Sequence, residues 1–190
     1  MKKRIKLHGF LIGAGVIAII IFYRHVLPSG PKGFLTDVLC LAGIVIGYLL
    51  RISARGVKAE NNPDGKTLVI KGPYIMTRNP MYLGTLLIGI SFTGMLFRWW
   101  VSLVFLIVYL GIYIAEIKKE EEKLLGFFGA DFKNYCSRIP RFFPDIRKVL
   151  VTNPFVYLGI KAKWVKKEFS SIVITFVLII ALKAAALFIS

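Results

Sequence analysis

The sequence predicts an all-α, polytopic integral membrane helix bundle with about five transmembrane helices. Of the 190 residues, 56% are hydrophobic and only 19% are charged. The apolar residues are gathered into five stretches of 17 to 20 residues: 7–23, 34–50, 80–97, 99–115 and 170–189. Only Asp37 and Lys183 are charged within them. A bilayer core of roughly 30 Å needs about 20 apolar helical residues, so each stretch is long enough to span. The pattern excludes a soluble globular protein, a disordered tail and a secreted disulfide scaffold.

The basic residues predict how the chain is oriented in the membrane. The formal net charge is +16, and 22 of the 26 lysines and arginines fall in the tail before 7, in 51–79 and in 116–169. The opposite side receives Arg24, Lys32 and Arg98. The positive-inside rule therefore places the N-terminus in the cytoplasm, and five spans place the C-terminus on the other side. Because topology explains the charge, we expect no nucleic-acid partner.

The first 50 residues are expected to form a two-helix hairpin around a loop rich in proline and glycine. Small-residue spacings, Gly9 to Gly13 and Gly43 to Gly47, predict close helix packing in each span. A polar loop over 51–79 is expected to follow.

The next pair of spans, 80–115, is predicted to be a tight helical hairpin. Pro80 suits the first turn of a helix, where its missing N–H is not needed. The second helix of the pair is expected to leave the membrane as a charged continuation, loosened at Gly126 and Gly129 before a helix-like stretch to Tyr135.

Residues 145–190 are expected to form an amphipathic linker and an extra transmembrane helix. Within 154–169, apolar residues at helical spacing and four lysines predict a helix in the head-group layer, with a solvated linker as the alternative. In the last span, Lys183 is expected to face another helix or a lipid phosphate. This span is expected to pack on its neighbours; closing a substrate groove or forming a homodimer contact are the alternatives.

Polar functional groups concentrate at the cytoplasmic ends of the 80–115 hairpin. Tyr74, Arg78, Asn79 and Tyr82 lie at its start, and Glu116 and the run 120–122 follow its end. A hairpin brings these two groups together, which suits a polar small molecule held beside a lipid. The alternative is a solvated charge run with basic partners. Two isolated histidines do not predict a metal site, and no catalytic residue is assigned.

The segments LVIKGPY at 68–74 and RNPMYLG at 78–84 resemble the isoprenylcysteine carboxyl methyltransferases, which belong with the integral-membrane phospholipid methyltransferases. Further matches follow in order: Glu120, Glu121, Leu124, Phe128, Gly129, Tyr135, Arg138 and the run 139–141. The resemblance covers roughly 66–144, which it defines as the methyltransferase core of a single membrane domain, 1–190.

The resemblance implies a methyltransferase that moves a methyl group from S-adenosyl-L-methionine to a lipid-like or hydrophobic acceptor in the membrane. Its acceptor would be an isoprenylcysteine carboxylate or a phospholipid amine. The resemblance also implies which residues contact the cofactor, in a module on the cytoplasmic side of the membrane. These are Lys66, Thr67, Leu68, Val69, Tyr74, Asn79, Pro80, Met81, Tyr82 and Glu120. Arg78 and Glu116 are the candidate substrate contacts.

Two positions depart from the family pattern. Asn79 replaces the usual histidine, so acid–base chemistry is lost there. Glu116 replaces an arginine implied to contact a carboxylate substrate, and a carboxylate at this position would repel such a substrate. These departures favour the alternative, a non-enzymatic membrane subunit or scaffold that keeps the fold. A reductase of similar membrane architecture is a further alternative.

Overall fold

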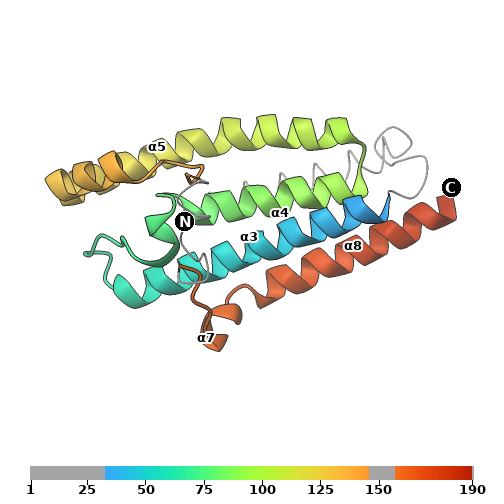
Figure 1. Ribbon diagram of the computed structural model, residues 1–190, viewed down its shortest axis with the longest axis horizontal. Coiled ribbons are helices and arrows are strands. Elements are labelled where there is room, and N and C mark those ends of the chain that lie inside the picture. The colour runs from blue at the N-terminus through green and yellow to red at the C-terminus, as the bar shows by residue number, and fades with distance from the viewer. Residues whose placement is uncertain (1–32, 146–156, 190) are drawn as a thin grey trace.

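The computed structural model describes residues 33–145 and 157–189, and the regular structure of these residues is entirely helical. The elements are α3 (Phe34–Asn61), the 3₁₀ helix η1 (Gly72–Ile75), α4 (Pro80–Leu96), α5 (Trp99–Arg138), α7 (Ala162–Val165) and α8 (Phe169–Ile189). The four long helices run side by side, with α4 and α3 between α5 and α8 (Figure 1). The predicted span 7–23 lies outside the described residues.

The other four predicted spans each fall on a helix. Two of these helices, α3 with 28 residues and α5 with 40, are long and apolar enough to cross a membrane. The apolar helices α4, with 17 residues, and 169–184 of α8 are shorter. The number of spans and their orientation remain predictions.

Helices α3 and α4 approach closely through glycines. A Cβ atom added to Gly47 would lie 2.7 Å from the carbonyl oxygen of Gly84, and one added to Gly84 would lie 2.6 Å from that of Gly47. A Cβ atom on Gly43 would meet Ser91 Oγ at 2.1 Å. The packing role predicted for Gly43 and Gly47 is therefore confirmed, whereas Gly9 and Gly13 lie outside the described residues.

The polar loop predicted over 51–79 is wrong for its first part, because α3 continues to Asn61. Ile52, Ala54 and Val57 are buried in this continuation, so its apolar side is covered although its charges resemble those of a loop. Gly56 admits the ring of Trp164, since a Cβ atom there would lie 1.9 Å from it. Tertiary packing thus extends the helix beyond its apolar stretch.

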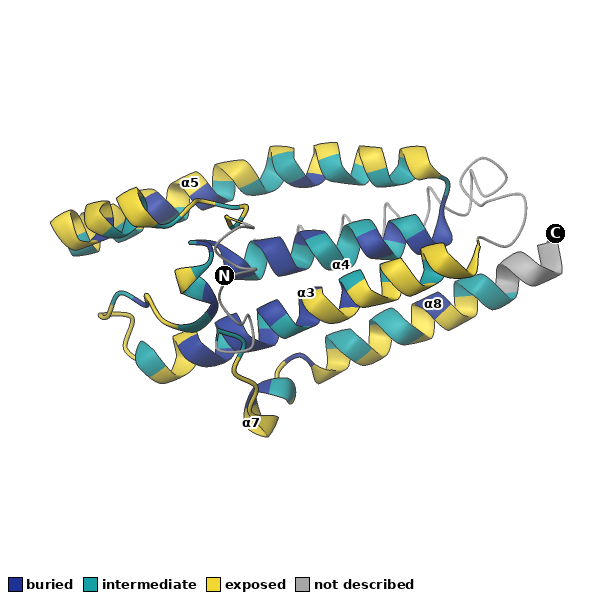
Figure 2. Ribbon diagram, in the orientation of Figure 1, coloured by how far each residue is buried: buried dark blue, intermediate teal, exposed yellow. Residues whose placement is uncertain are grey.

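Of the two glycines predicted to loosen α5, only Gly129 departs from helical geometry. Gly129 has a non-helical backbone (φ 51°, ψ −117°), and the residues before and after it are helical. Figure 2 shows that much of the outer face of α5 is exposed. Its exposed side chains include Leu103, Ile107 and Ile114, an apolar surface of the kind that faces lipid in a membrane.

The amphipathic helix predicted over 154–169 is wrong for the described part, since only Ala162–Val165 and Phe169, the first residue of α8, are helical. The segment is instead anchored on Glu60 at the charged end of α3. Lys161 and Lys163 Nζ each lie 2.6 Å from a Glu60 carboxylate oxygen, and Trp164 Nε1 donates to it at 3.0 Å. The hydrogen bonds from Lys161 and Lys163 lower the pKa of Glu60 to about 2.

Helix α8 is held against α3 at two levels. Near its start, the Tyr48 hydroxyl lies 2.7 Å from Thr175 Oγ1 and donates to the Ser171 carbonyl oxygen at 2.9 Å. Near its end, Lys183 forms an ion pair with Asp37. The cation in the last span thus has its partner in another helix, one of the two outcomes predicted for it.

Candidate functional site

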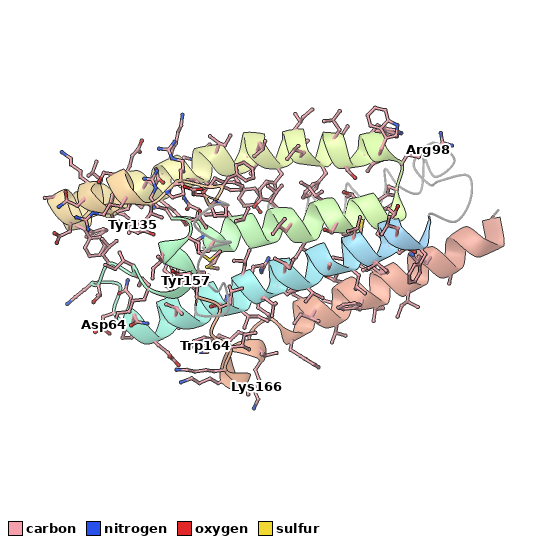
Figure 3. All side chains as sticks on the ribbon, in the orientation of Figure 1. Asp64, Arg98, Tyr135, Tyr157, Trp164 and Lys166 are labelled. Carbon is pink, nitrogen blue, oxygen red and sulfur yellow. The ribbon has the colours of Figure 1, made fainter. Side chains whose placement is uncertain are left out.

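The charged ends of the helices meet around one cavity. Figure 3 shows Arg98 at one end of the bundle and Asp64 and Tyr135 towards the other. A cavity of about 500 Å³ opens near the second end, between α3, α4 and α5. Its lining comprises Arg51, Arg55, Lys58, Tyr74, Arg78, Asn79, Pro80, Met81, Tyr82, Thr85, Tyr113, Glu120, Glu121, Leu124 and Phe132.

The segment before α4 is fixed by the chain returning after α5. The buried Thr77 hydroxyl donates to the Phe142 carbonyl oxygen at 2.8 Å, and the Arg78 backbone N–H donates to the Pro140 carbonyl oxygen at 3.0 Å. Pro80 occupies the first turn of α4, where a backbone N–H would have no helical acceptor. Residues 77–80 are thus held rigidly at the cavity wall.

Glu121 is the centre of the ion-pair network beneath this wall. Its Oε2 accepts from Arg141 Nε at 2.9 Å and lies 2.8 Å from Arg141 Nη2. Its Oε1 lies 3.3 Å from Arg78 Nη1 and accepts from Asn79 Nδ2 at 3.4 Å. Because its side chain is only 10% exposed, these partners replace the hydrogen bonds that water would otherwise supply to the carboxylate.

Asn79 serves this network rather than proton transfer. Its Nδ2 also donates to the Arg141 carbonyl oxygen at 2.9 Å, so the amide ties the start of α4 to the returning chain. An amide does not titrate, and its two contacts use it as a donor.

Aromatic side chains form a second part of the wall. The Tyr82 and Tyr113 rings lie 5.3 Å apart, and the Tyr109 hydroxyl donates to the Tyr82 carbonyl oxygen at 2.6 Å. On the other side, the Tyr135 hydroxyl donates to the Tyr74 carbonyl oxygen at 2.7 Å. Burial, and then the charge of Glu120, raise the pKa of Tyr74 above its usual range, so its phenol stays protonated.

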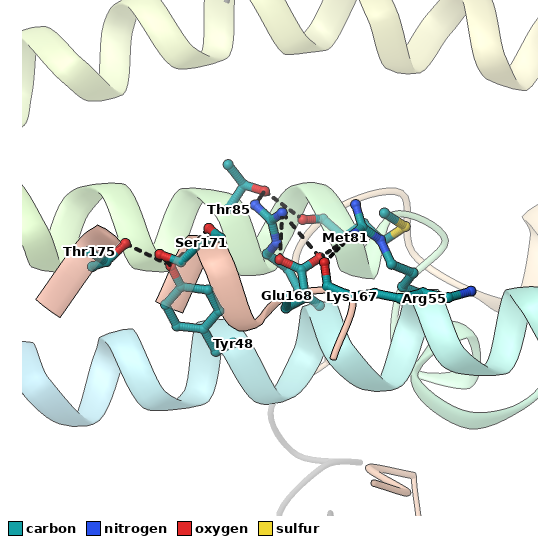
Figure 4. A network of polar contacts seen from close by, with 9 residues as sticks. Tyr48, Arg55, Met81, Thr85, Lys167, Glu168, Ser171 and Thr175 are labelled. Atoms are coloured by element: carbon teal, nitrogen blue, oxygen red, sulfur yellow. Dashed lines mark hydrogen bonds and ion pairs between the residues drawn. The ribbon is translucent and has the colours of Figure 1, made fainter. Parts of the chain in front are cut away.

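Basic side chains of α3 form the wall across from α5. Arg51, Arg55 and Lys58 are spaced four and three residues apart, which puts them on one face of the helix. The two arginines share the carboxylate of Glu168, which comes from the segment just before α8 (Figure 4).

The structure brings together seven of the twelve residues predicted for the site. Five predicted residues do not line this cavity. Glu116 lies on α5 with its carboxylate 3.3 Å from Lys119 Nζ, and 66–69 lie in the loop before η1. Within that loop Val69 belongs to the buried core, and Leu68 lines a second hollow of about 570 Å³ with Ile75, Tyr135 and other residues of α5.

The sequence interpretation missed the contribution of α3. Arg51, Arg55 and Lys58 had a detectable signal, since their spacing is helical, but assigning 51–79 to a loop hid it. Tyr113, Thr85 and Phe132 carried no such signal, because each sits in a stretch where aromatic and small polar residues are common. Which of them face the cavity depends on how α4 and α5 are rotated against each other.

These features define a helical bundle with a polar, partly aromatic cavity where its apolar helices become charged. The phospholipid methyltransferase family model matches residues 35–131, just over half of the chain. The chain belongs to the phospholipid methyltransferase family, which confirms the resemblance drawn from its motifs. The family and the apolar helices α3 and α5 together indicate a membrane protein.

One curated relative is the protein-S-isoprenylcysteine O-methyltransferase of Mus musculus. It is 28% identical over 116 residues, which cover 57% of this chain and 41% of that protein. The match thus spans less than half of the relative's length. No solved structure matches the chain.

Proposed function

We propose that this protein is an integral-membrane methyltransferase that takes the methyl group of S-adenosylmethionine and transfers it to a lipid-like or hydrophobic acceptor. One observation carries the proposal. Seven residues expected at the site from the motifs, on η1, α4, α5 and the turn before α4, line a single cavity, and all seven lie inside the family-matched segment.

The cavity suits the donor in size and chemistry. Its volume of about 500 Å³ falls within the roughly 300–1,000 Å³ typical of small-molecule sites. Glu120 offers a carboxylate that can accept hydrogen bonds from an ammonium group or ribose hydroxyls. The rings of Tyr82 and Tyr113 offer electron-rich faces to a sulfonium cation.

Methyl transfer from a sulfonium is an in-line displacement that needs alignment and exclusion of water more than covalent help. Holding two reactants in line can supply on the order of 7–11 kcal/mol. The contacts of Thr77, Asn79 and Glu121 make the wall rigid, which is the contribution this reaction requires. No side chain has to become covalently linked to either reactant.

The topology completes the proposal. The positive-inside rule places the N-terminus and the cavity on the cytoplasmic side, where the donor is found, and the C-terminus on the opposite side. The acceptor then enters from the bilayer. An isoprenylcysteine carboxylate and a phospholipid amine both remain acceptor types, and membrane lipids are the expected partners.

Titration calorimetry of the purified full chain with S-adenosylmethionine tests the proposal. We expect saturable binding that Glu120→Ala and Tyr82→Ala each weaken at least tenfold, the effect of losing one charged or cation–π contact of about 1.5 kcal/mol. Glu122→Ala is the matched control, since Glu122 is an exposed carboxylate on the same helix that does not line the cavity.

Absence of saturable binding in a folded protein would contradict the proposal and favour the alternative, a membrane subunit or scaffold. Equal effects of all three variants would show that the cavity is not where the donor binds.

A further inference from the structure

Glu168 is the most deeply buried carboxylate near the cavity, although it comes from outside the family-matched segment. Its side chain is 1% exposed and lies between two guanidinium groups of α3. Arg51 Nη2 donates to its Oε2 at 3.0 Å, and Arg55 Nη1 lies 2.7 Å from its Oε1. Glu168 is thus covered by the arginines and does not itself line the cavity.

The cavity wall formed by the basic side chains of α3 keeps a net positive charge although Glu168 pairs with two of them. One carboxylate faces two guanidinium groups, and Lys58 adds a third cation on the same helix face. The two acidic side chains that line the cavity, Glu120 and Glu121, both come from α5, and Glu121 is engaged by Arg78 and Arg141. The α3 wall therefore carries cations beyond those that Glu168 balances.

Arg51 is fixed in position by two partners and still reaches the cavity. Its Nη1 donates to Thr85 Oγ1 at 3.0 Å, and its Nη2 is held by Glu168. Its buried Nε finds no acceptor among the described residues. The side chain is 20% exposed and lines the cavity. A guanidinium that is fixed in position and partly exposed to a cavity suits a phosphate or carboxylate.

The position of Arg51 along α3 indicates what carries that anion. It directly follows the apolar stretch 34–50, and Thr85 is in the second turn of α4. In a helix that crosses a bilayer, the first charged residue after the apolar stretch lies at the boundary between hydrocarbon and head groups. The anionic group of a membrane amphiphile lies at the same level.

We infer that Arg51 and Arg55 form the subsite for the anionic group, a phosphate or carboxylate, of the amphiphilic methyl acceptor, and that Glu168 is the positioning residue of this subsite. The inference rests on the proposed function, and it adds to that function the residues that hold the acceptor's anionic group. It also makes the C-terminal segment part of the site, since this segment supplies Glu168.

The test is equilibrium binding of radiolabelled lysophosphatidate to the purified full chain in a neutral detergent. Dodecyl phosphate and dodecanoate should compete, and dodecyl glucoside should not. Arg51→Gln and the more exposed Arg55→Gln should each weaken binding by roughly 10- to 100-fold, as expected for a charge-assisted hydrogen bond. The far-UV circular dichroism spectrum of each variant reports that it is folded, and binding of S-adenosylmethionine is measured beside that of lysophosphatidate.

The Glu168→Gln variant distinguishes a positioning role of Glu168 from the effect of its negative charge on anion binding. If Glu168 holds the arginines in place, its loss weakens lysophosphatidate binding, whereas removing a negative charge alone would strengthen it. Glu60→Gln is the matched control, because Glu60 anchors the same segment through Lys161 and Trp164 without contacting either arginine. It should leave lysophosphatidate binding unchanged.

Stronger or unchanged binding in Glu168→Gln would overturn the positioning role. If the arginine variants weaken S-adenosylmethionine binding and spare lysophosphatidate, the subsite holds the donor's carboxylate and the inference is wrong. If the wild type binds lysophosphatidate through Arg51 but binds no S-adenosylmethionine, the proposed function fails while the anion subsite stands.

Discussion

Glu121 offers the sharpest test of how the cavity wall is held. Its carboxylate is the shared partner of Arg78, Asn79 and Arg141, and replacing it with glutamine keeps the size of the side chain while removing the charge. Glu121→Gln should therefore loosen the segment before α4 from the chain that returns after α5.

The size of the effect follows from how deeply the partners are buried. Removing one member of a buried ion pair costs about 3–5 kcal/mol. The Arg78 side chain is 12% exposed and approaches this limit, whereas Arg141 is 50% exposed and is well solvated without its partner. We therefore expect Glu121→Gln to lower the free energy of unfolding by about 2–4 kcal/mol.

Reversible unfolding in mixed detergent micelles measures this difference. Glu122→Gln is the control, because the neighbouring side chain is exposed and surface substitutions of this kind stay within about 0.5 kcal/mol. If the two variants have the same free energy of unfolding, the network around Glu121 does not hold the wall.

Two further predictions concern the packing of α3. Gly47→Ala should destabilise the protein by about 1–3 kcal/mol, because its methyl group would meet the backbone of α4. Gly111→Ala, with nothing within 4 Å, should stabilise it by about 0.5–1 kcal/mol; equal effects in the same micelles would contradict the close helix approach. The folded-state pKa of Glu60 is lowered from 4.5 to about 2, so its ion pairs stabilise the fold above pH 4.5 and are lost as the pH falls towards 2. In a variant with Trp164 as the only tryptophan, its fluorescence should change with a midpoint near pH 2, and a transition that persists in Glu60→Gln would refute the assignment.

The sequence was sufficient to predict the long apolar helices because their signal is local. Long apolar stretches gave α4, α8 and the first part of α3, and Gly129 marked the change of direction in α5. The continuation of α3 to Asn61 was missed, because its stability depends on η1 and on Trp164, which is about a hundred residues away. Hydropathy carries no information about a partner that distant.

The candidate site likewise has one part that the sequence could predict and another that depends on residues distant in sequence. The contiguous motif around Asn79 and the carboxylate of Glu120 could be placed together, because a tight hairpin joins them in sequence. The pairing of Arg51 with Glu168 could not be predicted, since 117 residues separate them and no pattern relates them. The loop 66–69 was assigned by resemblance alone, and the structure places Leu68 at a second hollow and Val69 in the buried core.

The most direct test of the central claim is methyl transfer itself. The purified full chain is incubated with S-adenosylmethionine labelled in its methyl group and a total membrane lipid extract, and label is then measured in the separated lipid classes. We predict label in an amphiphile with wild type and with Glu122→Ala, and a loss of tenfold or more with Glu120→Ala, as expected for the loss of a charge-assisted contact. Label no higher than in a protein-free control, or equal label with Glu120→Ala, would contradict the assignment of methyl transfer to this cavity.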